Sequence, residues 1–295
     1  MNSAFHLAGI IPIAGFESDF GFPWHDCLQP LASDYVATEA AVVEAAFAGC
    51  ETIWIVCNDD MQPLIRHRLG DYVQDPVWIH RGYKKYPKEH RKRIPIFYVP
   101  IHPKDYMQRD CYAWSILHGA TTAWRIAKTL SKWVVPKKYY VSFPYGVYPP
   151  ETIREHRTVI SSDKNFYLSY NGRTFKDGEY LGFSFGEEDY KMFRDVIRTG
   201  TGKIVPGTFS YGGEKKFLPT KQKYSARHFS LDKVFKDAKI DTAVGVELPW
   251  YYPIDNWENL VTFLGSEERK IIERPHKAFL KYKELNPIGV DNEEE

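Results

Sequence analysis

Apolar runs that favour buried strands alternate with helical stretches through the first half of the chain. The strand-like runs span 6–14, 52–57, 94–101 and 138–149, and the helical stretches span 33–50, 61–73 and 112–130. Strands that read as near-continuous apolar runs are typical of parallel sheets with both faces covered by helices. The alternation therefore predicts an α/β fold with a doubly wound, mostly parallel sheet.

The pattern changes near residue 151. Residues 165–185 carry Asn171-Gly172 and Asp177-Gly178 between aromatic runs, which predicts a smaller antiparallel portion joined by tight turns. A helix at 187–200, an irregular loop at 199–227, and a strand, a turn and a helix within 247–266 are expected to follow. We therefore expect an α/β half at 1–150, a β-rich and helical second half of the same domain at 151–285, and a disordered acidic tail at 286–295.

Charge and cysteine usage limit the partners and the compartment. The 39 basic and 38 acidic residues nearly cancel, so no global field draws the chain to nucleic acid or to a membrane surface. No segment has the roughly 18 apolar residues of a membrane span. Cys27, Cys50, Cys57 and Cys111 show no C-x-x-C spacing, which favours reduced, buried thiols in a cytoplasmic protein over a disulfide or zinc role.

Three stretches in order along the chain carry a family resemblance. Ala14-Gly15 and Pro23 have the nine-residue separation of an A-G-G-x-G-T-R-x-x-P loop, and Gln29-Pro30-Leu31 stands where K-P-L follows it. Residues 178–183 match a g-x-y-x-G strand, and residues 254–260 match an I-D-T-P-E-D-L turn. The chain thus resembles the sugar nucleotidyltransferases, which have the nucleotide-diphospho-sugar transferase fold of the glycosyltransferase-A type.

The resemblance implies a nucleotide or a nucleotide-sugar at the carboxyl edge of the sheet in the first half. It assigns substrate contacts to Ala14, Gly15, Ser18, Asp19, Glu179 and Tyr180. It also places Gln29 beside the reacting phosphate and Asp255 on a catalytic magnesium ion. The implied reaction is the attack of a phosphate on the α-phosphate of a nucleoside triphosphate.

The loop also departs from the family pattern. Phe16 replaces a glycine, Ser18-Asp19 replaces G-T, Phe20 replaces the arginine, and Gln29 replaces the lysine. Pro144-Tyr145-Gly146 stands where the family's G-D supplies a second metal carboxylate. Because cations that hold phosphates stabilise the transition state, we expect nucleotidyl transfer to be altered or lost. A polar cleft that joins Gly15, Gln29, Asp59 and Asp255 would favour a retained ligand.

Three aspartates, in two turns, can each be interpreted in two ways. Asp255 lies in the turn before the last helix, where it could bind a metal or ribose; the alternative is that Asp255 or Asn256 caps that helix. Asp59 and Asp60 follow the strand at 52–57, on the edge where open α/β sheets bind ligands, and Asp59 is our further candidate for substrate contact. The alternative is that they cap the helix at 61–73.

The segment 80–93 is strongly basic. It combines Arg81, Lys84, Lys85, Lys88, Arg91, Lys92 and Arg93 with two tyrosines, as a nucleic-acid or polyphosphate contact would. A solvated loop, or a patch that docks on an acidic protein, explains the same residues. Because no nucleic-acid-binding motif accompanies the segment, we do not expect nucleic acid as the partner.

Two functions of different class follow from these features. The first is a nucleotidyltransferase-like protein that binds a nucleotide or nucleotide-sugar with Mg²⁺. The second is a non-catalytic interaction protein that keeps the fold as a scaffold, since tyrosine and tryptophan favour interfaces with a protein partner or a second copy of the chain. The chain also resembles uncharacterised proteins of marine tailed phages labelled capsid- or scaffold-related, which implies the second function.

Overall fold

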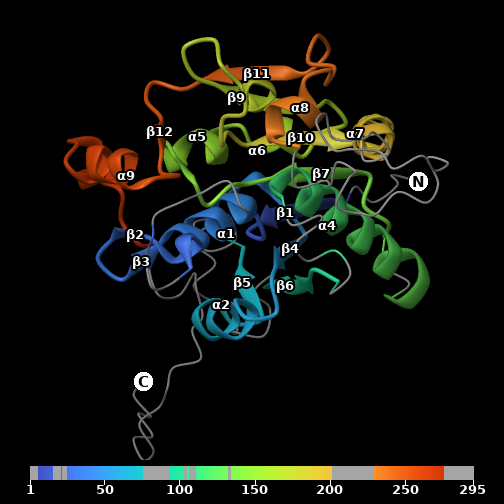
Figure 1. Ribbon diagram of the computed structural model, residues 1–295, viewed down its shortest axis with the longest axis horizontal. Helices are drawn as coiled ribbons and strands as arrows, with labels where there is room; N and C mark the ends of the chain where they lie inside the picture. The colour runs from blue at the N-terminus through green and yellow to red at the C-terminus, as the bar shows by residue number, and fades with distance from the viewer. Residues whose placement is uncertain are drawn as a thin grey trace, which may run out of the picture.

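A central sheet of eight strands organises the chain. The computed structural model describes residues 6–15, 21, 25–75, 93–102, 105, 111–131, 134–200 and 229–275. The strands of the sheet are β1 (Leu7–Pro12), β4 (Thr52–Cys57), β5 (Tyr72–Gln74), β6 (Arg93–Pro100), β7 (Lys138–Val141), β9 (Phe166–Ser169), β10 (Phe183–Gly186) and β11 (Val244–Glu247). Their order is β11-β9-β10-β7-β1-β4-β6-β5, so strands from both halves of the chain share one sheet (Figure 1).

The centre of this sheet is parallel and its flanks are mixed. β1 pairs in parallel with β4 and with β7, and β4 pairs in parallel with β6. β10 runs antiparallel to both β7 and β9, β5 runs antiparallel to β6, and β11 is parallel to β9. The predicted fold, a mostly parallel sheet with an antiparallel portion in the second half, is therefore confirmed.

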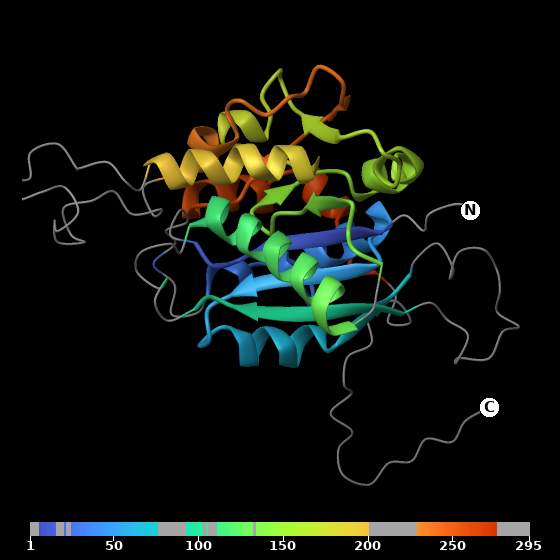
Figure 2. The same cartoon turned by 90° about the vertical axis from the view of Figure 1, so that its right-hand side faces the viewer.

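Helices cover both faces of the sheet. The α-helices of the described residues are α1 (Ala37–Ala48), α2 (Gln62–Leu69), α4 (Tyr112–Ile126), α5 (Pro150–Glu155), α6 (Arg157–Ile160), α7 (Glu187–Gly200), α8 (Leu231–Phe235) and α9 (Trp257–Leu264). A Cβ at Gly9 would lie 3.1 Å from Ala45 of α1, whereas Ile10 packs against Gly119 of α4. Because neighbouring strand residues point to opposite faces, α1 and α4 lie on opposite sides of β1, and Figure 2 shows α4 crossing the strands.

Two small antiparallel sheets stand beside the main sheet. One is the hairpin of β2 (Pro30–Ala32) and β3 (Tyr35–Val36), and the other pairs β8 (Gly146–Val147) with β12 (Tyr252–Pro253). A second hydrophobic core joins them to α9, and it consists of Leu31, Tyr35, Ala37, Val147, Ile254, Leu260, Phe263 and Ile272. The hairpin near the start of the chain thus packs against the last helix (Figure 1).

The start of α1 differs from the expectation. Ser33 and Asp34, the first residues of the helical stretch predicted at 33–50, form the β2–β3 turn instead, with Asp34 at φ 55°. The first residue before α1 is Val36, whose N–H donates to the carboxylate of Glu39 at 3.1 Å. Gly49 ends the helix, in the left-handed conformation at φ 91° that glycine adopts without strain.

α2 is shorter than the predicted helix at 61–73. It ends at Leu69, and Tyr72–Gln74 form β5 because they pair with β6 at the sheet edge. The segment 165–185 folds as expected into antiparallel strands, with Asn171 and Gly172 both at positive φ in the turn. β9 and β10 are joined through the 3-10 helix Phe175–Asp177.

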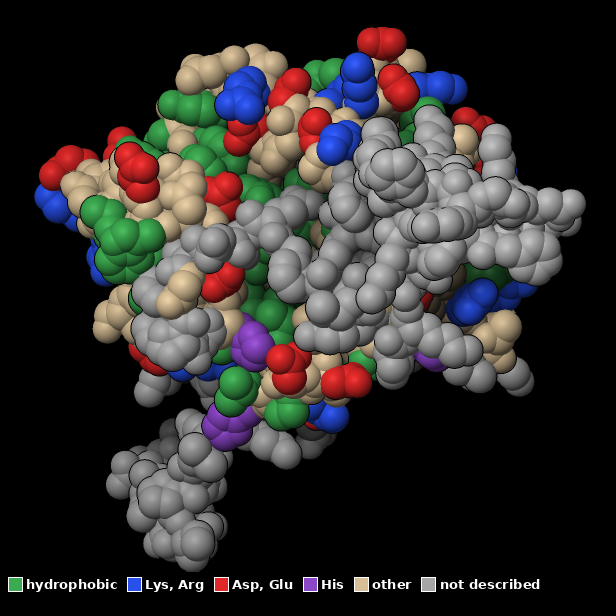
Figure 3. Space-filling model, in the orientation of Figure 1, with side chains coloured by type: hydrophobic (Ala, Val, Ile, Leu, Met, Phe, Trp, Pro, Cys, Tyr) green, Lys and Arg blue, Asp and Glu red, His purple; other side chains and the backbone are tan. Residues whose placement is uncertain are grey.

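All four cysteines are buried and free, in agreement with the prediction of reduced thiols. Burial raises the pKa of the Cys27 and Cys57 thiols to about 12, so they are protonated at neutral pH. Among the described residues, no helix is long and apolar enough to cross a membrane. On the face seen in Figure 3, acidic and basic side chains are interspersed, in keeping with the balanced composition.

Candidate functional site

Backbone and hydroxyl hydrogen bonds fix the end of β1. The N–H groups of Ile13 and Ala14 both donate to the carbonyl of Val56 at 2.9 Å, and the Ser115 hydroxyl donates to the carbonyl of Ala14. A Cβ at Gly15 would lie 2.2 Å from the ring of Tyr112. Only glycine permits this close approach, so Gly15 serves here to seat an aromatic ring against the strand end.

Aromatic side chains fill the region next to Gly15. The ring centroid of Tyr112 lies 5.1 Å from that of Tyr145 and 6.0 Å from that of Tyr180. Phe143 lies 5.7 Å from Tyr180, and all four side chains are buried. Tyr145 belongs to the stretch Pro144-Tyr145-Gly146, which stands where the resemblance implies the G-D of the family motif. A packed ring therefore stands where the resemblance implies a carboxylate.

Gln29 lies in the chain between the 3-10 helix Asp26–Leu28 and β2, and in space it lies next to the first residue of α1. Its carbonyl accepts the N–H of Ala37, the first residue of α1, at 2.9 Å. Its side chain is fully buried, and within the described part of the chain neither amide atom has a hydrogen-bond partner. Buried amides in native proteins are almost always paired. The side-chain amide of Gln29 thus offers one donor group and one acceptor group, without partners among the described residues, at the K-P-L position.

The turn after β4 contains a residue that the sequence reasoning missed. Asp59 and Asp60 are exposed, and Asp60 accepts the N–H of Met61 at 3.0 Å, next to the start of α2. The residue before them, Asn58, has a buried side-chain oxygen with no hydrogen-bond partner among the described residues. A polar residue directly after a buried strand was the available signal, and it applied to Asn58 as much as to Asp59.

Glu179 and Tyr180 are engaged within the protein. Glu179 forms an ion pair with Arg173 at 2.7 Å, and its side chain is 14% exposed. The N–H of Tyr180 donates to the hydroxyl of Tyr251 at 3.0 Å while its ring packs against Tyr145. Their expected contact with a substrate stays a prediction.

Asp255 lies next to the aromatic cluster because the N–H of Ile254 donates to the carbonyl of Tyr145 at 2.8 Å. One oxygen of Asp255 accepts the side-chain amides of Asn256 and Asn259, at 3.1 and 2.8 Å. Asn256 is the residue that caps α9, since its side-chain oxygen accepts the N–H of Asn259. Of the two readings for this turn, the helix cap is therefore observed, and Asn256 rather than Asp255 provides it.

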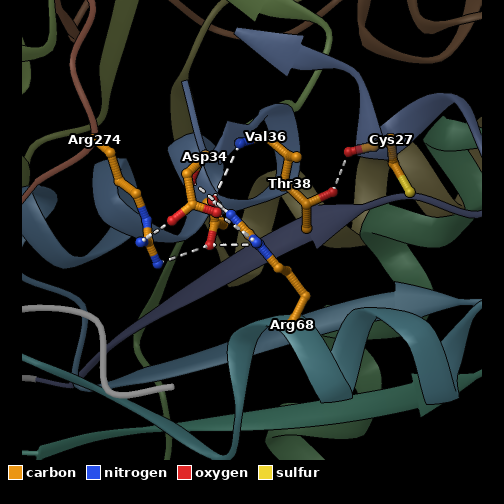
Figure 4. Close-up of polar contacts among 7 residues, drawn as sticks. Cys27, Asp34, Val36, Thr38, Arg68 and Arg274 are labelled. Atoms are coloured by element: carbon orange, nitrogen blue, oxygen red, sulfur yellow. Dashed lines mark hydrogen bonds and ion pairs between the residues drawn. The ribbon is translucent and has the colours of Figure 1, made fainter. Parts of the chain in front are cut away.

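A buried carboxylate fixes the hairpin that follows Gln29. Glu39 is fully buried and receives two hydrogen bonds from Arg68 of α2, both at 3.0 Å. Arg68 also donates to Asp34 in the hairpin turn, and Arg274 pairs with the same aspartate at 2.5 Å. Arg68 and Arg274 converge on Asp34 from two sides (Figure 4). This cluster ties the hairpin to α1, α2 and the segment around Arg274.

Several predicted residues lie outside the described part of the chain. They are Phe16, Ser18, Asp19 and Phe20 of the opening loop, together with Arg81, Lys84, Lys85, Lys88, Arg91 and Lys92 of the basic segment. Of that segment only Arg93 is described, and its guanidinium lies 4.7 Å from the ring centroid of Tyr72. A cavity of about 260 Å³ beside α1 is lined by none of Gly15, Gln29, Asp59 or Asp255, so it is not the polar cleft that was expected to join them.

No protein-family profile and no curated protein sequence matches the chain. Solved structures do match its fold. A Bacillus anthracis protein assigned as a glucose-1-phosphate thymidylyltransferase, in complex with sucrose, has 8% identity and a TM-score of 0.53 over 92% of this chain and 98% of that one. A UDP-glucose pyrophosphorylase complexed with UDP-glucose has 12% identity and a TM-score of 0.52, over 90% and 100%.

The apo form of a UDP-glucose pyrophosphorylase is similar at 12% identity, with a TM-score of 0.53 over 91% of this chain and all of that one. At such low identity these likenesses concern the fold alone. The predicted nucleotidyltransferase-like fold is confirmed by them, while the chemistry of the site rests on the residues described above.

Proposed function

We propose that this chain binds a nucleotide or a nucleotide-sugar at the carboxyl edge of its sheet, and that nucleotidyl transfer is altered or lost. The observation that carries the proposal is the buried side-chain amide of Gln29, which has no hydrogen-bond partner within the described residues. Leaving a buried polar group unpaired costs about 1–3 kcal/mol. A ligand that supplies the missing partners explains why such a group is kept at the K-P-L position of this fold.

The chemistry of an amide sets what Gln29 can and cannot do. Its NH₂ group donates to a phosphate or sugar oxygen, and its carbonyl accepts from a ribose hydroxyl or a base N–H. It carries no charge, so it gives little stabilisation to the negative charge that develops on phosphate during transfer. Gln29 is therefore suited to ground-state binding more than to catalysis.

The residues at Asp255 do not fit a magnesium ion held by the protein alone. One of its oxygens already accepts two amide hydrogen bonds, and the neighbouring stretch Pro144-Tyr145-Gly146 carries no carboxylate. Across the described residues, no group of three or more His, Cys, Asp or Glu side chains could hold a metal. The contribution of magnesium to ligand binding is tested by titrating each ligand with and without it.

Calorimetric titration of the purified chain tests the proposal. The ligands are UTP, dTTP, CTP, ATP, GTP, UDP-glucose and dTDP-glucose, each with and without MgCl₂. We expect at least one to bind, and we expect Gln29→Met to weaken that binding at least tenfold because both hydrogen bonds are lost. Asp255→Ala is expected to weaken it as well. Absence of binding across the panel would overturn the proposal and favour the non-catalytic interaction protein.

A stability measurement separates a binding role of Gln29 from a structural one. Methionine fills a similar volume without polar atoms, so Gln29→Met should raise the free energy of unfolding of the ligand-free chain by about 1 kcal/mol. The matched control is Gln74→Met in β5, another buried glutamine, which should leave ligand binding unchanged. Loss of stability in Gln29→Met with unchanged affinity would contradict the binding role.

A further inference from the structure

A cavity of about 260 Å³ lies beside α1, apart from the proposed nucleotide site. Its walls come from α1, the β2–β3 hairpin, residues 146–154 and residues 271–275. The apolar part of the lining includes Leu31, Tyr35, Val43, Phe47, Val147 and Ile272. Sites for drug-sized ligands begin at roughly 300 Å³, so this cavity suits a molecule smaller than a nucleotide.

Glu44 of α1 brings a carboxylate to the wall of this cavity. One carboxylate oxygen accepts the hydroxyl of Tyr140 at 2.7 Å. Burial raises the pKa of Glu44 to about 7, although the hydroxyls of Tyr148, Tyr140 and Ser142 act in the opposite direction. Among the described residues no Lys, Arg or His forms an ion pair with it.

A buried carboxylate is normally paired, because burying an isolated charge is costly. Glu44 is intermediate in exposure and has no cationic partner among the described residues, whereas the fully buried carboxylate of Glu39, on the same helix, pairs with Arg68. Glu44 is also the residue of the pair that borders a cavity. The missing partner of Glu44 therefore has room to arrive from outside the chain.

The other charged groups around the cavity favour a cation. Glu44, Glu151 and Glu273 line it together with a single guanidinium, that of Arg154. This excess of carboxylates disfavours phosphates and other anions. The aromatic side chains of Tyr35, Phe47 and Tyr148 in the same lining offer ring faces, which attract organic cations.

We propose that this cavity binds a small organic cation, an ammonium ion on an apolar body, whose ammonium group pairs with the carboxylate of Glu44. The apolar body lies against the side chains from α1, the β2–β3 hairpin and Ile272. The ammonium group supplies the positive partner that the fold does not. The site is independent of the proposed nucleotide site and does not rest on its occupancy.

The test uses 2-phenylethylammonium as the probe, titrated into the full chain at pH 8 by calorimetry. Neutral 2-phenylethanol and anionic phenylacetate, of the same aromatic body, are the comparison ligands. We expect the ammonium compound to bind, with the alcohol at least tenfold weaker and no binding of phenylacetate. Equal affinity for the alcohol, or no binding of the ammonium compound, would overturn the proposal.

Two variants locate the binding. Glu44→Gln keeps an oxygen that accepts from Tyr140 but removes the charge. It should therefore weaken the binding of the ammonium compound at least tenfold. Ala40→Leu adds bulk at a residue that lines the cavity and should weaken every ligand that enters it. Glu258→Gln on the exposed side of α9 is the matched control and should change nothing. Unchanged affinity in both cavity variants would place any binding elsewhere and refute the assignment.

Discussion

At the scale of single residues, Glu44 links the stability of the fold to pH. Its pKa is raised by burial to about 7 from 4.5, so between these values the folded chain keeps a proton that the unfolded chain has released. The free energy of unfolding therefore falls as pH rises through this window, by up to about 3 kcal/mol, and stays level above it. Glu44→Gln cannot ionise, so it should lack this slope and be more stable than the native chain at pH 8.

Urea unfolding of both proteins at intervals from pH 5 to pH 8 measures this difference. Among the described residues, the buried groups that interact with Glu44 include Tyr35, Tyr140, Tyr148 and Cys50, and burial raises the pKa of each. They stay neutral over this range and add no slope of their own. Other titrating groups are common to both proteins and cancel in the difference. Parallel stability curves would contradict the assignment of a raised pKa to Glu44.

At the scale of elements, the Glu39 cluster holds α2 and the β2–β3 hairpin together. Arg68→Met would leave the buried carboxylate of Glu39 with Arg274, at 3.6 Å, as its cationic partner, besides the N–H of Val36. Removing one partner of a buried ion pair costs about 3–5 kcal/mol, because the remaining charge is left without compensation. Arg68 is 30% exposed, so we expect a loss near the lower end, about 3 kcal/mol, in urea unfolding at pH 7.

A second arginine on the same helix provides the matched control. Arg66 pairs with Asp71 at 2.8 Å, but both side chains are 55% exposed. Exposed ion pairs contribute little to stability, so Arg66→Met should leave the unfolding midpoint almost unchanged. If Arg66→Met destabilised the chain as much as Arg68→Met, burial of Glu39 would not be the reason for the effect.

Element by element, the sequence predicted what local patterns encode. The apolar runs placed β1, β4, β6 and β7, and Gly49 marked the end of α1 because glycine adopts its left-handed conformation. Local sequence patterns gave the wrong secondary structure where contacts with residues distant in the sequence determine it. Asp34 has the composition of a helix cap but sits in a hairpin turn bound by Arg68 and Arg274, and Tyr72–Gln74 joined β6 instead of extending α2.

At the scale of the whole molecule, motif order located the site only in part. The topology carries Gly15, Tyr180 and Asp255 to the same aromatic cluster rather than to a polar cleft. The surroundings of each side chain depend on tertiary packing, which the spacing of motifs in the sequence does not reveal. The buried, unpaired amide of Gln29 is an example. The cavity next to Glu44 needs three distant segments, so no local pattern could have indicated it.

The molecule has two hydrophobic cores, and we expect the smaller one, between the hairpin and α9, to unfold more easily than the core of the main sheet. The core between the hairpin and α9 contains Phe263, which is fully buried, and it is separate from the core of the main sheet. Phe263→Ala should cost about 3–5 kcal/mol because it leaves a cavity among apolar side chains. Val261→Ala, on the exposed side of the same helix, is the control and should have a small effect.

Amide hydrogen exchange identifies the segments that Phe263→Ala destabilises. We expect Phe263→Ala to speed exchange in β8 and β12 and at Ile254, whose N–H donates to Tyr145, because these groups are held by the second core. Exchange in β1 and β4 should stay slow, since their side chains belong to the main core. Faster exchange throughout β1 and β4 would mean that the two cores unfold as one unit. Local loosening would instead leave the parallel sheet intact while it releases the hairpin that follows Gln29.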